Sequence, residues 1–121
     1  MAAGDADGSA SIGTSEYFLV SQSTSKTDRT VDVFAQILMD FGAMLAADVY
    51  EYRVLEKVNG NTQRNVIGPL RLVGVQAIPV WIPGVYLKDG WEIGVKKISG
   101  TDRTIYWSIR AVAVTYLTSG L

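Results

Sequence analysis

The stretch that decides the fold spans residues 91–109 and reads WEIGVKKISGTDRTIYWSI. Each half alternates large apolar residues with small or polar ones, and the tripeptide Ser99-Gly100-Thr101 lies between the halves. Alternation with period two is typical of a strand that has one buried face. A three-residue loop would pair the halves as a hairpin and bring all six large apolar side chains to one face. The expected pairs are Val95 with Ile105, Ile93 with Trp107, and Trp91 with Ile109.

The same register predicts the environment of several other residues. On the reverse face Tyr106 would cover Gly94, an arrangement in which an aromatic ring shields a bare glycine. Gly100 would supply the left-handed backbone conformation that such loops need. Trp91 and Trp107 are predicted as core residues rather than as a platform for a ligand.

Short strand patterns separated by turn signals fill much of the remaining chain. Residues 31–41 alternate, and the Asn59-Gly60-Asn61 turn predicts a hairpin between residues 49–58 and 63–75. The second of these strands is interrupted near Gly68-Pro69, because proline favours an edge strand or a bulge. Further strands are expected at residues 17–22, 77–82 and 85–87, and one helical turn at residues 44–47. We therefore expect an all-β fold, an antiparallel β-sandwich of about seven to eight short strands that is jelly-roll-like, with the strand order left open.

The N-terminal segment differs from the rest of the chain. Ten of the first fifteen residues are Gly, Ala or Ser, and the large apolar residues there are Met1 and Ile12. Such a composition buries too little surface to offset the entropy lost on ordering. We expect an extended, flexible N-terminal arm over residues 1–14 and one β-sandwich domain over residues 15–121. The arm is either a frayed terminus or a segment that orders against a neighbour in an assembly.

The composition argues against most kinds of catalysis. The 121 residues include no cysteine and no histidine, although 48% are hydrophobic. The chain therefore lacks a thiolate nucleophile, the usual general base and the commonest metal ligand. No phosphate-binding loop or nucleophile elbow is present, and Asp5-Ala6-Asp7-Gly8 lacks the later ligands of a calcium loop. We expect no enzymatic activity, no metal and no cofactor.

The charge is balanced overall but divided along the chain. The net charge is −1, without the basic excess of a nucleic-acid-binding protein. Residues 1–60 carry nine acids and four bases, and residues 61–121 carry three acids and seven bases. This division is either chance or the mark of a subunit that packs against copies of itself or a larger partner. Lys97 and Arg103, directly opposed in the expected hairpin, form either a solvated tip or a contact for an acidic surface.

The N-terminus shows neither the basic region nor the apolar region of a secretory signal, and no stretch is long and apolar enough to span a membrane. We therefore expect synthesis in a cytoplasm and no membrane partner.

The segment from Ile78 to Tyr86 is unusually apolar and contains two prolines. Proline cannot donate a hydrogen bond to a sheet, so the segment is expected at an edge. An edge that carries Trp81, Ile82 and Tyr86 is either covered within the chain or buried by a partner. Because aromatic residues are favoured interface anchors, this segment is the first candidate for a protein–protein contact.

Three stretches carry a resemblance to a known class of proteins. They are MAAGD at residues 1–5, VYEYRVLEKV at residues 49–58, and GWEIGVKKISGTDR at residues 90–103, the last followed by WSIR at residues 107–110. They resemble small structural proteins of tailed bacteriophages, of the kind that decorate or cement the head. The similarity covers residues 30–110 and consists of turn and core patterns rather than catalytic signatures. It implies a homo-oligomeric β-sandwich or jelly-roll-like subunit on the capsid surface of the virion, bound to the major capsid protein or to copies of itself.

Two kinds of function therefore stay open. The first is a virion structural protein, namely a capsid decoration or cement protein that bridges and stabilises neighbouring coat subunits, with a tail or baseplate position not separable from it. The second is a carbohydrate-binding or receptor-binding module whose aromatic platform comes from Trp81, Tyr86, Tyr50, Tyr52 or Tyr116. The candidate partner-interface residues are Ala2, Ala3, Asp5, Asp7, Ile12, Trp81, Ile82, Pro83, Tyr86, Lys97 and Arg103.

Overall fold

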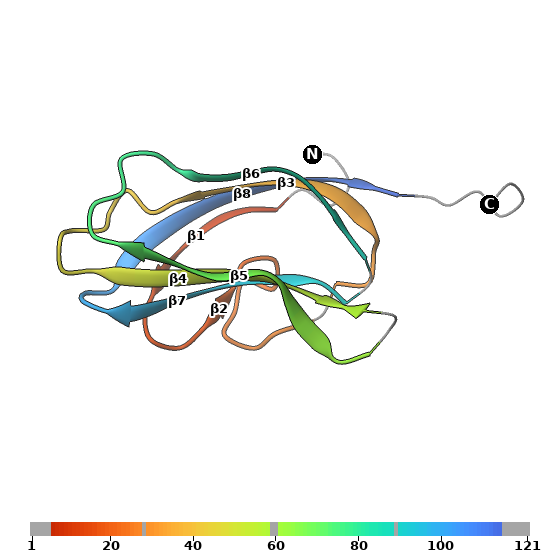
Figure 1. Ribbon diagram of the computed structural model, residues 1–121, viewed down its shortest axis with the longest axis horizontal. Coiled ribbons are helices and arrows are strands. Elements are labelled where there is room, and N and C mark those ends of the chain that lie inside the picture. Colours follow the sequence, from red (N-terminus) through yellow and green to blue (C-terminus); the bar gives the residue numbers. More distant parts are fainter. Residues whose placement is uncertain (1–5, 28, 59–60, 89, 115–121) are drawn as a thin grey trace, which may run out of the picture.

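The computed structural model describes residues 6–27, 29–58, 61–88 and 90–114. These residues form eight β-strands in two antiparallel sheets, with the orders β1-β8-β3-β6 and β2-β7-β4-β5, and they contain no helix. Figure 1 shows the two layers. The predicted all-β sandwich is confirmed. The strands are β1 (Ala6–Ile12), β2 (Tyr17–Phe18), β3 (Val33–Asp40), β4 (Val49–Lys57), β5 (Gln63–Val73), β6 (Val80–Leu87), β7 (Glu92–Ser99) and β8 (Arg103–Ala113).

The strand pairs are nested within one another. β1 pairs with β8, β2 with β7, β3 with β6 and β4 with β5. The chain is thus one long hairpin, folded over so that successive pairs enter opposite sheets, and the β3–β8 and β4–β7 pairs complete the sheets. This is the order of an eight-stranded jelly roll, which resolves the alternative that the sequence left open. The innermost pair, β4–β5, confirms the hairpin predicted around Asn59-Gly60-Asn61.

The hairpin predicted within residues 91–109 is wrong. β7 and β8 lie in opposite sheets, and the chain crosses between the sheets at residues 100–102. All six large apolar side chains are nevertheless buried, because they face one another across the core instead of lying side by side. Period-two alternation specifies which side chains are buried but leaves the neighbouring strand undetermined. Gly100 does adopt the expected positive φ, at 95°.

The environments predicted for the reverse face of that hairpin are also wrong. Gly94 lies beneath Glu16, whose carboxylate would be 2.1 Å from an added Cβ. Tyr106 lies instead between Ser9 of β1 and Asp40 of β3. Both differences follow from the placement of β7 and β8 in different sheets.

The segment predicted as an arm contains a strand. β1 pairs with β8 over its whole length, and Ile12 is 1% exposed within the core. Gly8 lies directly on the indole of Trp107, where an added Cβ would be 2.5 Å from the ring. The small residues of β1 therefore let this strand approach a large core side chain closely. Residues 1–5 lie outside the described residues.

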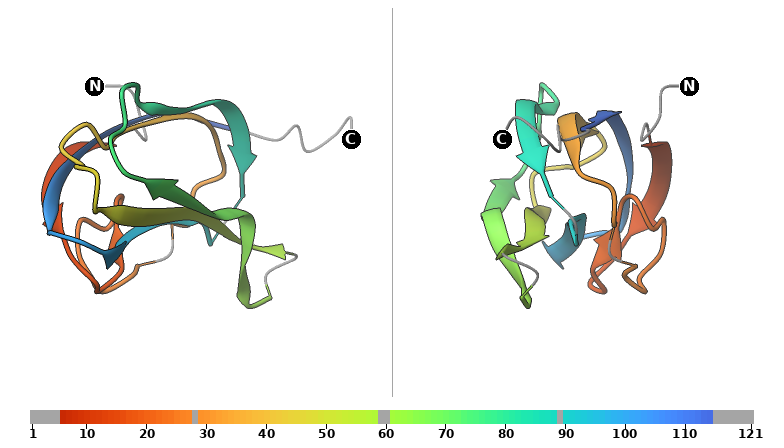
Figure 2. Two further views of the ribbon diagram at one scale, coloured as in Figure 1. Left: turned by 60° about the vertical axis from the view of Figure 1, so that its left-hand side comes forward. Right: turned by 90° about the vertical axis from the view of Figure 1, so that its right-hand side faces the viewer.

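The other strand boundaries differ modestly from expectation. β2 is shorter than residues 17–22, and the two strands expected between residues 77 and 87 are one strand, β6. Residues 44–47 form turns rather than a helical turn, with N–H···O bonds of 3.0 Å from Met44 to Phe41 and from Asp48 to Leu45. The predicted edge position of the proline-bearing segment is confirmed for β6. Figure 2 shows β5 and β6 at one side of the sandwich and β1 and β2 at the other.

Candidate protein-binding face

The outer face of the β1-β8-β3-β6 sheet carries large apolar side chains at positions that point away from the core. The strand register places Val112, Phe34 and Tyr86 in one row across three strands, and it places Leu38 beside Trp81. Phe34 is 54% exposed, Trp81 58% and Val112 66%. An exposed apolar patch of this kind is typical of an interaction site. We call this surface the apolar sheet face, and it comprises Phe34, Leu38, Trp81, Tyr86, Tyr106 and Val112.

A hollow of about 240 Å³ opens on the apolar sheet face. Its lining is largely apolar, and Tyr106 is 57% exposed beside it. Two polar groups in the lining have partners: Asp40 accepts a 2.7 Å hydrogen bond from the Gly42 N–H, and the Ser108 hydroxyl donates one of 2.7 Å to Asp7. Among the residues that the structure describes, the buried Trp107 Nε1 has no hydrogen-bond partner. Because its lining is mostly apolar, the hollow suits an apolar side chain better than an ion. It is lined by Leu38, Asp40, Pro79, Tyr106, Trp107 and Ser108.

The row that contains Phe34 is held in place by the edge strand. The Phe34 ring lies over Gly84, where an added Cβ would be 2.9 Å from the ring. Partial burial, with a contribution from the Asp32 and Glu56 carboxylates, raises the pKa of the neighbouring Tyr86 phenol above its ordinary value. The row therefore stays uncharged at neutral pH.

The outer face of the other sheet is charged and internally paired. Arg53 bonds Glu16 through two nitrogens, at 2.6 and 2.7 Å. Glu51 lies 3.5 Å from the Arg71 guanidinium and 3.9 Å from the Lys96 ammonium. The hydrogen bond to Glu16 raises the pKa of Arg53. We call these five residues the charged sheet face; their pairing suits contact with water.

A second exposed apolar surface lies at one end of the sandwich. There the β3–β4 loop meets the β5–β6 loop (Figure 1), and the Gly74 N–H donates a 2.8 Å hydrogen bond to the Asp48 carbonyl. Ile78 is 79% exposed. We call this surface the apolar loop end, and it comprises Leu45, Val73, Val75 and Ile78.

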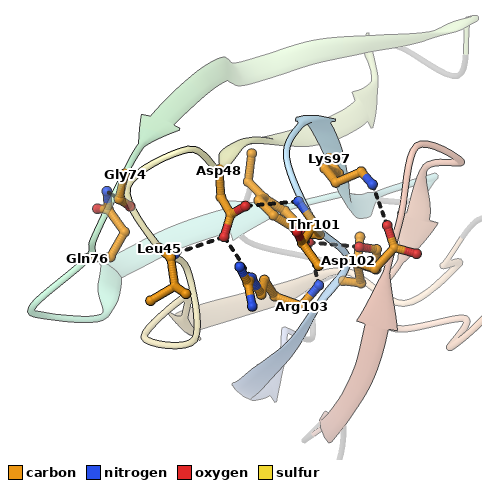
Figure 3. A network of polar contacts seen from close by, with 10 residues as sticks. Leu45, Asp48, Gly74, Gln76, Lys97, Thr101, Asp102 and Arg103 are labelled. Atoms are coloured by element: carbon orange, nitrogen blue, oxygen red, sulfur yellow. Dashed lines mark hydrogen bonds and ion pairs between the residues drawn. The ribbon is translucent and has the colours of Figure 1, made fainter.

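A buried carboxylate fixes the loops at this end (Figure 3). Asp48 accepts hydrogen bonds from the backbone N–H groups of Leu45 and Thr101, at 2.8 and 2.9 Å, and from Arg103 Nε at 2.7 Å. These three donors, the two backbone groups foremost, lower the pKa of Asp48 to about 2. Gly100 leaves room for the carboxylate, because an added Cβ would be 2.3 Å from Asp48 Oδ1.

The predicted like-charge pair of Lys97 and Arg103 is wrong. Lys97 pairs with Asp102 at 2.5 Å, and Arg103 pairs with Asp48. Both cations are thus neutralised within the chain, and Arg103 holds a loop. The error follows from the hairpin register, which is not formed.

A second buried carboxylate, Glu92, fixes the segment that follows β2. It accepts hydrogen bonds from the N–H groups of Val20 and Ser21, both at 3.1 Å, and from the Ser21 hydroxyl at 2.6 Å. Glu92 and Asp48 therefore both hold loops onto the sandwich. Within the described ranges, no group of three or more acidic residues lies together as a metal site would require.

The acidic first half and the basic second half of the chain form ion pairs with each other within one molecule. Acids of the first half meet bases of the second half in Asp48–Arg103, Glu51–Arg71 and Glu51–Lys96. Nested pairing places early strands beside late ones, so such pairs form within a single molecule. The division therefore does not by itself indicate an acidic or basic partner.

The structure separates the predicted interface residues into groups. Trp81, Tyr86 and Pro83 are exposed on β6, and Asp7 is exposed on β1. Ile82 pairs with core residue Ile37 and is half-buried, facing inward. The assignment of Ile12 as an interface residue is corrected, because its side chain lies in the core. Ala2, Ala3 and Asp5 lie outside the described residues.

The aromatic platform expected for glycan binding is reduced. Tyr50 and Tyr52 are core residues, and the Tyr50 hydroxyl bonds the Ile12 carbonyl at 2.8 Å. Tyr116 lies outside the described residues. Trp81 and Tyr86 are exposed on the apolar sheet face.

Sequence reasoning missed most of the apolar sheet face. Phe34 and Leu38 occupy the outward-facing positions of the alternating residues 31–41, where polar side chains are expected. Tyr106 and Val112 occupy the corresponding positions of β8. Large apolar residues in the solvent phase of a strand are the signal that could have identified them.

No protein-family model, curated protein or solved structure matches the chain. In the part of the chain that the structure describes, no helix is long and apolar enough to cross a membrane.

Proposed function

We propose that the protein is a structural subunit that works by binding other protein subunits. Specifically, it is a decoration or cement protein on the head of a tailed bacteriophage, where it bridges and stabilises neighbouring major coat subunits. The observation that carries this proposal is the apolar sheet face, where aromatic side chains of a four-stranded sheet are exposed. Exposed aromatic residues in a contiguous patch are the usual anchors of protein interfaces. The phage assignment is supported by the sequence resemblance at residues 49–58 and 90–103.

Bridging requires at least two contact surfaces on one subunit. The apolar sheet face covers one layer of the sandwich, and the apolar loop end lies where the β3–β4 and β5–β6 loops meet. Asp48 and Arg103 hold the loop end rigid, which reduces the entropy lost on binding. A subunit with these two surfaces can join one neighbour to another.

Co-sedimentation with empty coat shells of the particle that encodes the chain tests this function. We expect the protein to sediment with the shells, and Ile78→Asp to weaken binding at the apolar loop end by at least tenfold. Val58→Asp is a matched control, because Val58 is also exposed but follows the opposite end of β4. Absence of shell binding by the unaltered protein would overturn the proposal. Many copies per particle by mass spectrometry indicate the head, and a few copies indicate the tail.

Carbohydrate binding is a second candidate, favoured by the hollow beside Tyr106. Sugar rings stack on exposed aromatic rings, and Asp40 offers a carboxylate in the same lining. In a glycan array we expect binding that Tyr106→Ala abolishes if this candidate is correct. An array without a hit leaves the structural function as the single candidate.

A further inference from the structure

We infer that the apolar sheet face binds the same face of a second copy of this chain, related by a twofold axis that runs across the strands. The inference rests on the proposed function, because it names the partner of one of the two contact surfaces that this function uses. A twofold contact requires a surface that is complementary to itself. The shape and the charges of the face meet this requirement, and its area fits a reversible dimer.

The face has a ridge at one end and the hollow at the other. Val112, Phe34 and Tyr86 form the ridge, whereas Asp40 and Tyr106 line the hollow. Phe34 and Asp40 are six residue steps apart on β3, a distance of roughly 20 Å along a strand. A twofold axis midway between them places each ridge over the partner's hollow, so that both contacts form at once. An apolar cavity of about 150 Å³ holds a benzene ring, so the hollow of about 240 Å³ has room for a phenyl group.

The charges of the face are complementary about the same axis. Arg110 is exposed beside Gln36, to which it donates a 3.2 Å hydrogen bond. Asp7 is exposed in the next row, where it pairs with Ser108. The axis passes between the row of Arg110 and the row of Asp7 and Ser108. It therefore places the Arg110 guanidinium over Ser108 of the second copy, and Asp7 of that copy lies on the adjacent strand. The contact occurs twice, because the axis exchanges the two copies.

The size of the face fits a dimer of moderate affinity. Four strands about 4.8 Å apart and eight residues at about 3.3 Å cover on the order of 500 Å² in projection. Side-chain relief makes the accessible area larger than the projection. A standard stable interface buries about 800 Å² per partner. The face is therefore of the order that a reversible dimer needs, and Trp81 adds an anchor that is 58% exposed.

Sedimentation equilibrium of the 121-residue protein over a concentration series tests the inference. We expect a reversible monomer–dimer equilibrium. Arg110→Asp and Asp7→Arg should each weaken self-association by at least tenfold, because each creates two like-charge contacts in the homodimer. A mixture of the two variants should recover association, since the mixed dimer regains an opposite charge at both contacts.

Two further variants separate the interface from a change in folding. Phe34→Ser removes the ridge and should weaken association by at least tenfold. Arg71→Asp makes the same charge change as Arg110→Asp but lies on the charged sheet face, so it should leave the dissociation constant unchanged. Circular dichroism melts of each variant confirm that the sandwich is folded.

Three results would each overturn the inference: a monomer at every concentration, a dimer insensitive to Arg110→Asp and Phe34→Ser, or a variant mixture that fails to recover association. The shell assay is independent of these results. A monomer that still binds coat shells through the apolar loop end rejects this inference and leaves the proposed function standing. A dimer that binds no shell rejects the proposed function and supports the inference.

Discussion

The two outer faces of the sandwich are built from strands of the same kind but carry different side chains. On the β2-β7-β4-β5 sheet the solvent-facing positions hold charges that pair with one another, as Arg53 does with Glu16. On the β1-β8-β3-β6 sheet the same phase holds exposed aromatic residues such as Phe34 and Tyr106. Both sheets bury the opposite phase in a shared core. The comparison teaches that the core phase specifies the fold, whereas the solvent phase of one sheet is free to specify a partner.

The largest difference in stability is expected between substitutions at two adjacent residues of β8, one facing the core and one facing outward. Trp107→Ala leaves a cavity in the core and should lower the free energy of unfolding by about 3–5 kcal/mol. Tyr106→Ala removes an outward ring and should change it by less than about 0.5 kcal/mol. Urea denaturation followed by fluorescence of the remaining tryptophans measures both. Similar losses in the two variants would show that the apolar sheet face stabilises the fold rather than serving a partner.

Strong acid should loosen the loop end, which Asp48 holds together. The pKa of Asp48 is about 2 in the folded protein against an ordinary value of 3.8. Its contribution to stability is therefore complete above about pH 4 and is lost as the pH falls toward 2. We expect the melting temperature to fall over this window, and Asp48→Asn to be less stable at neutral pH with a flatter acid dependence. An unchanged acid dependence in Asp48→Asn would contradict the role of this carboxylate.

The paired charges of the charged sheet face should contribute modestly. Arg53→Met breaks a two-bond contact with Glu16 that is only partly exposed, and it should lower the free energy of unfolding by about 1 kcal/mol. The loss should shrink in 1 M salt, because salt screens ion pairs near the surface. Thermal melts at low and high salt measure the difference. A loss that is independent of salt would point to packing of the arginine stem instead.

The smallest effect is expected at the exposed end of the same face. Arg71 is more exposed than Arg53 and lies 3.5 Å from Glu51, so Arg71→Ala should change the free energy of unfolding by less than about 0.5 kcal/mol. Urea denaturation checks this value. A cost as large as that of Arg53→Met would mean that the charged sheet face acts as one cooperative network.

Local pattern predicted the buried residues better than their neighbours. The Asn-Gly turn correctly predicted the β4–β5 hairpin. Period-two alternation correctly predicted the burial of six large apolar residues, namely Trp91, Ile93, Val95, Ile105, Trp107 and Ile109. The β7–β8 pairing was wrong because the jelly roll joins strands far apart in sequence, and no local signal encodes such a pairing.

Local sequence patterns predicted only part of the candidate site, because they do not encode which strands are neighbours. Proline placed Trp81 and Tyr86 at an edge, and the strand order confirms that β6 is an edge strand. Phe34 and Tyr106 were missed because each strand was interpreted by its buried phase. The predicted pairing of Lys97 with Arg103 depended on a hairpin register that does not form. The prediction of an arm missed β1, because small residues favour disorder unless a large side chain such as Trp107 lies beneath them.

The nested pairing also sets the timing of folding during synthesis. Ala6 pairs with Ile109, so β1 leaves the ribosome long before its partner strand exists. At roughly 5–20 residues per second, the wait is on the order of 5–20 s. An unpaired strand rich in apolar residues would invite aggregation during that time. The Ala, Gly and Ser residues that let β1 lie against Trp107 in the finished sandwich also keep the nascent strand from adhering to other chains while it waits.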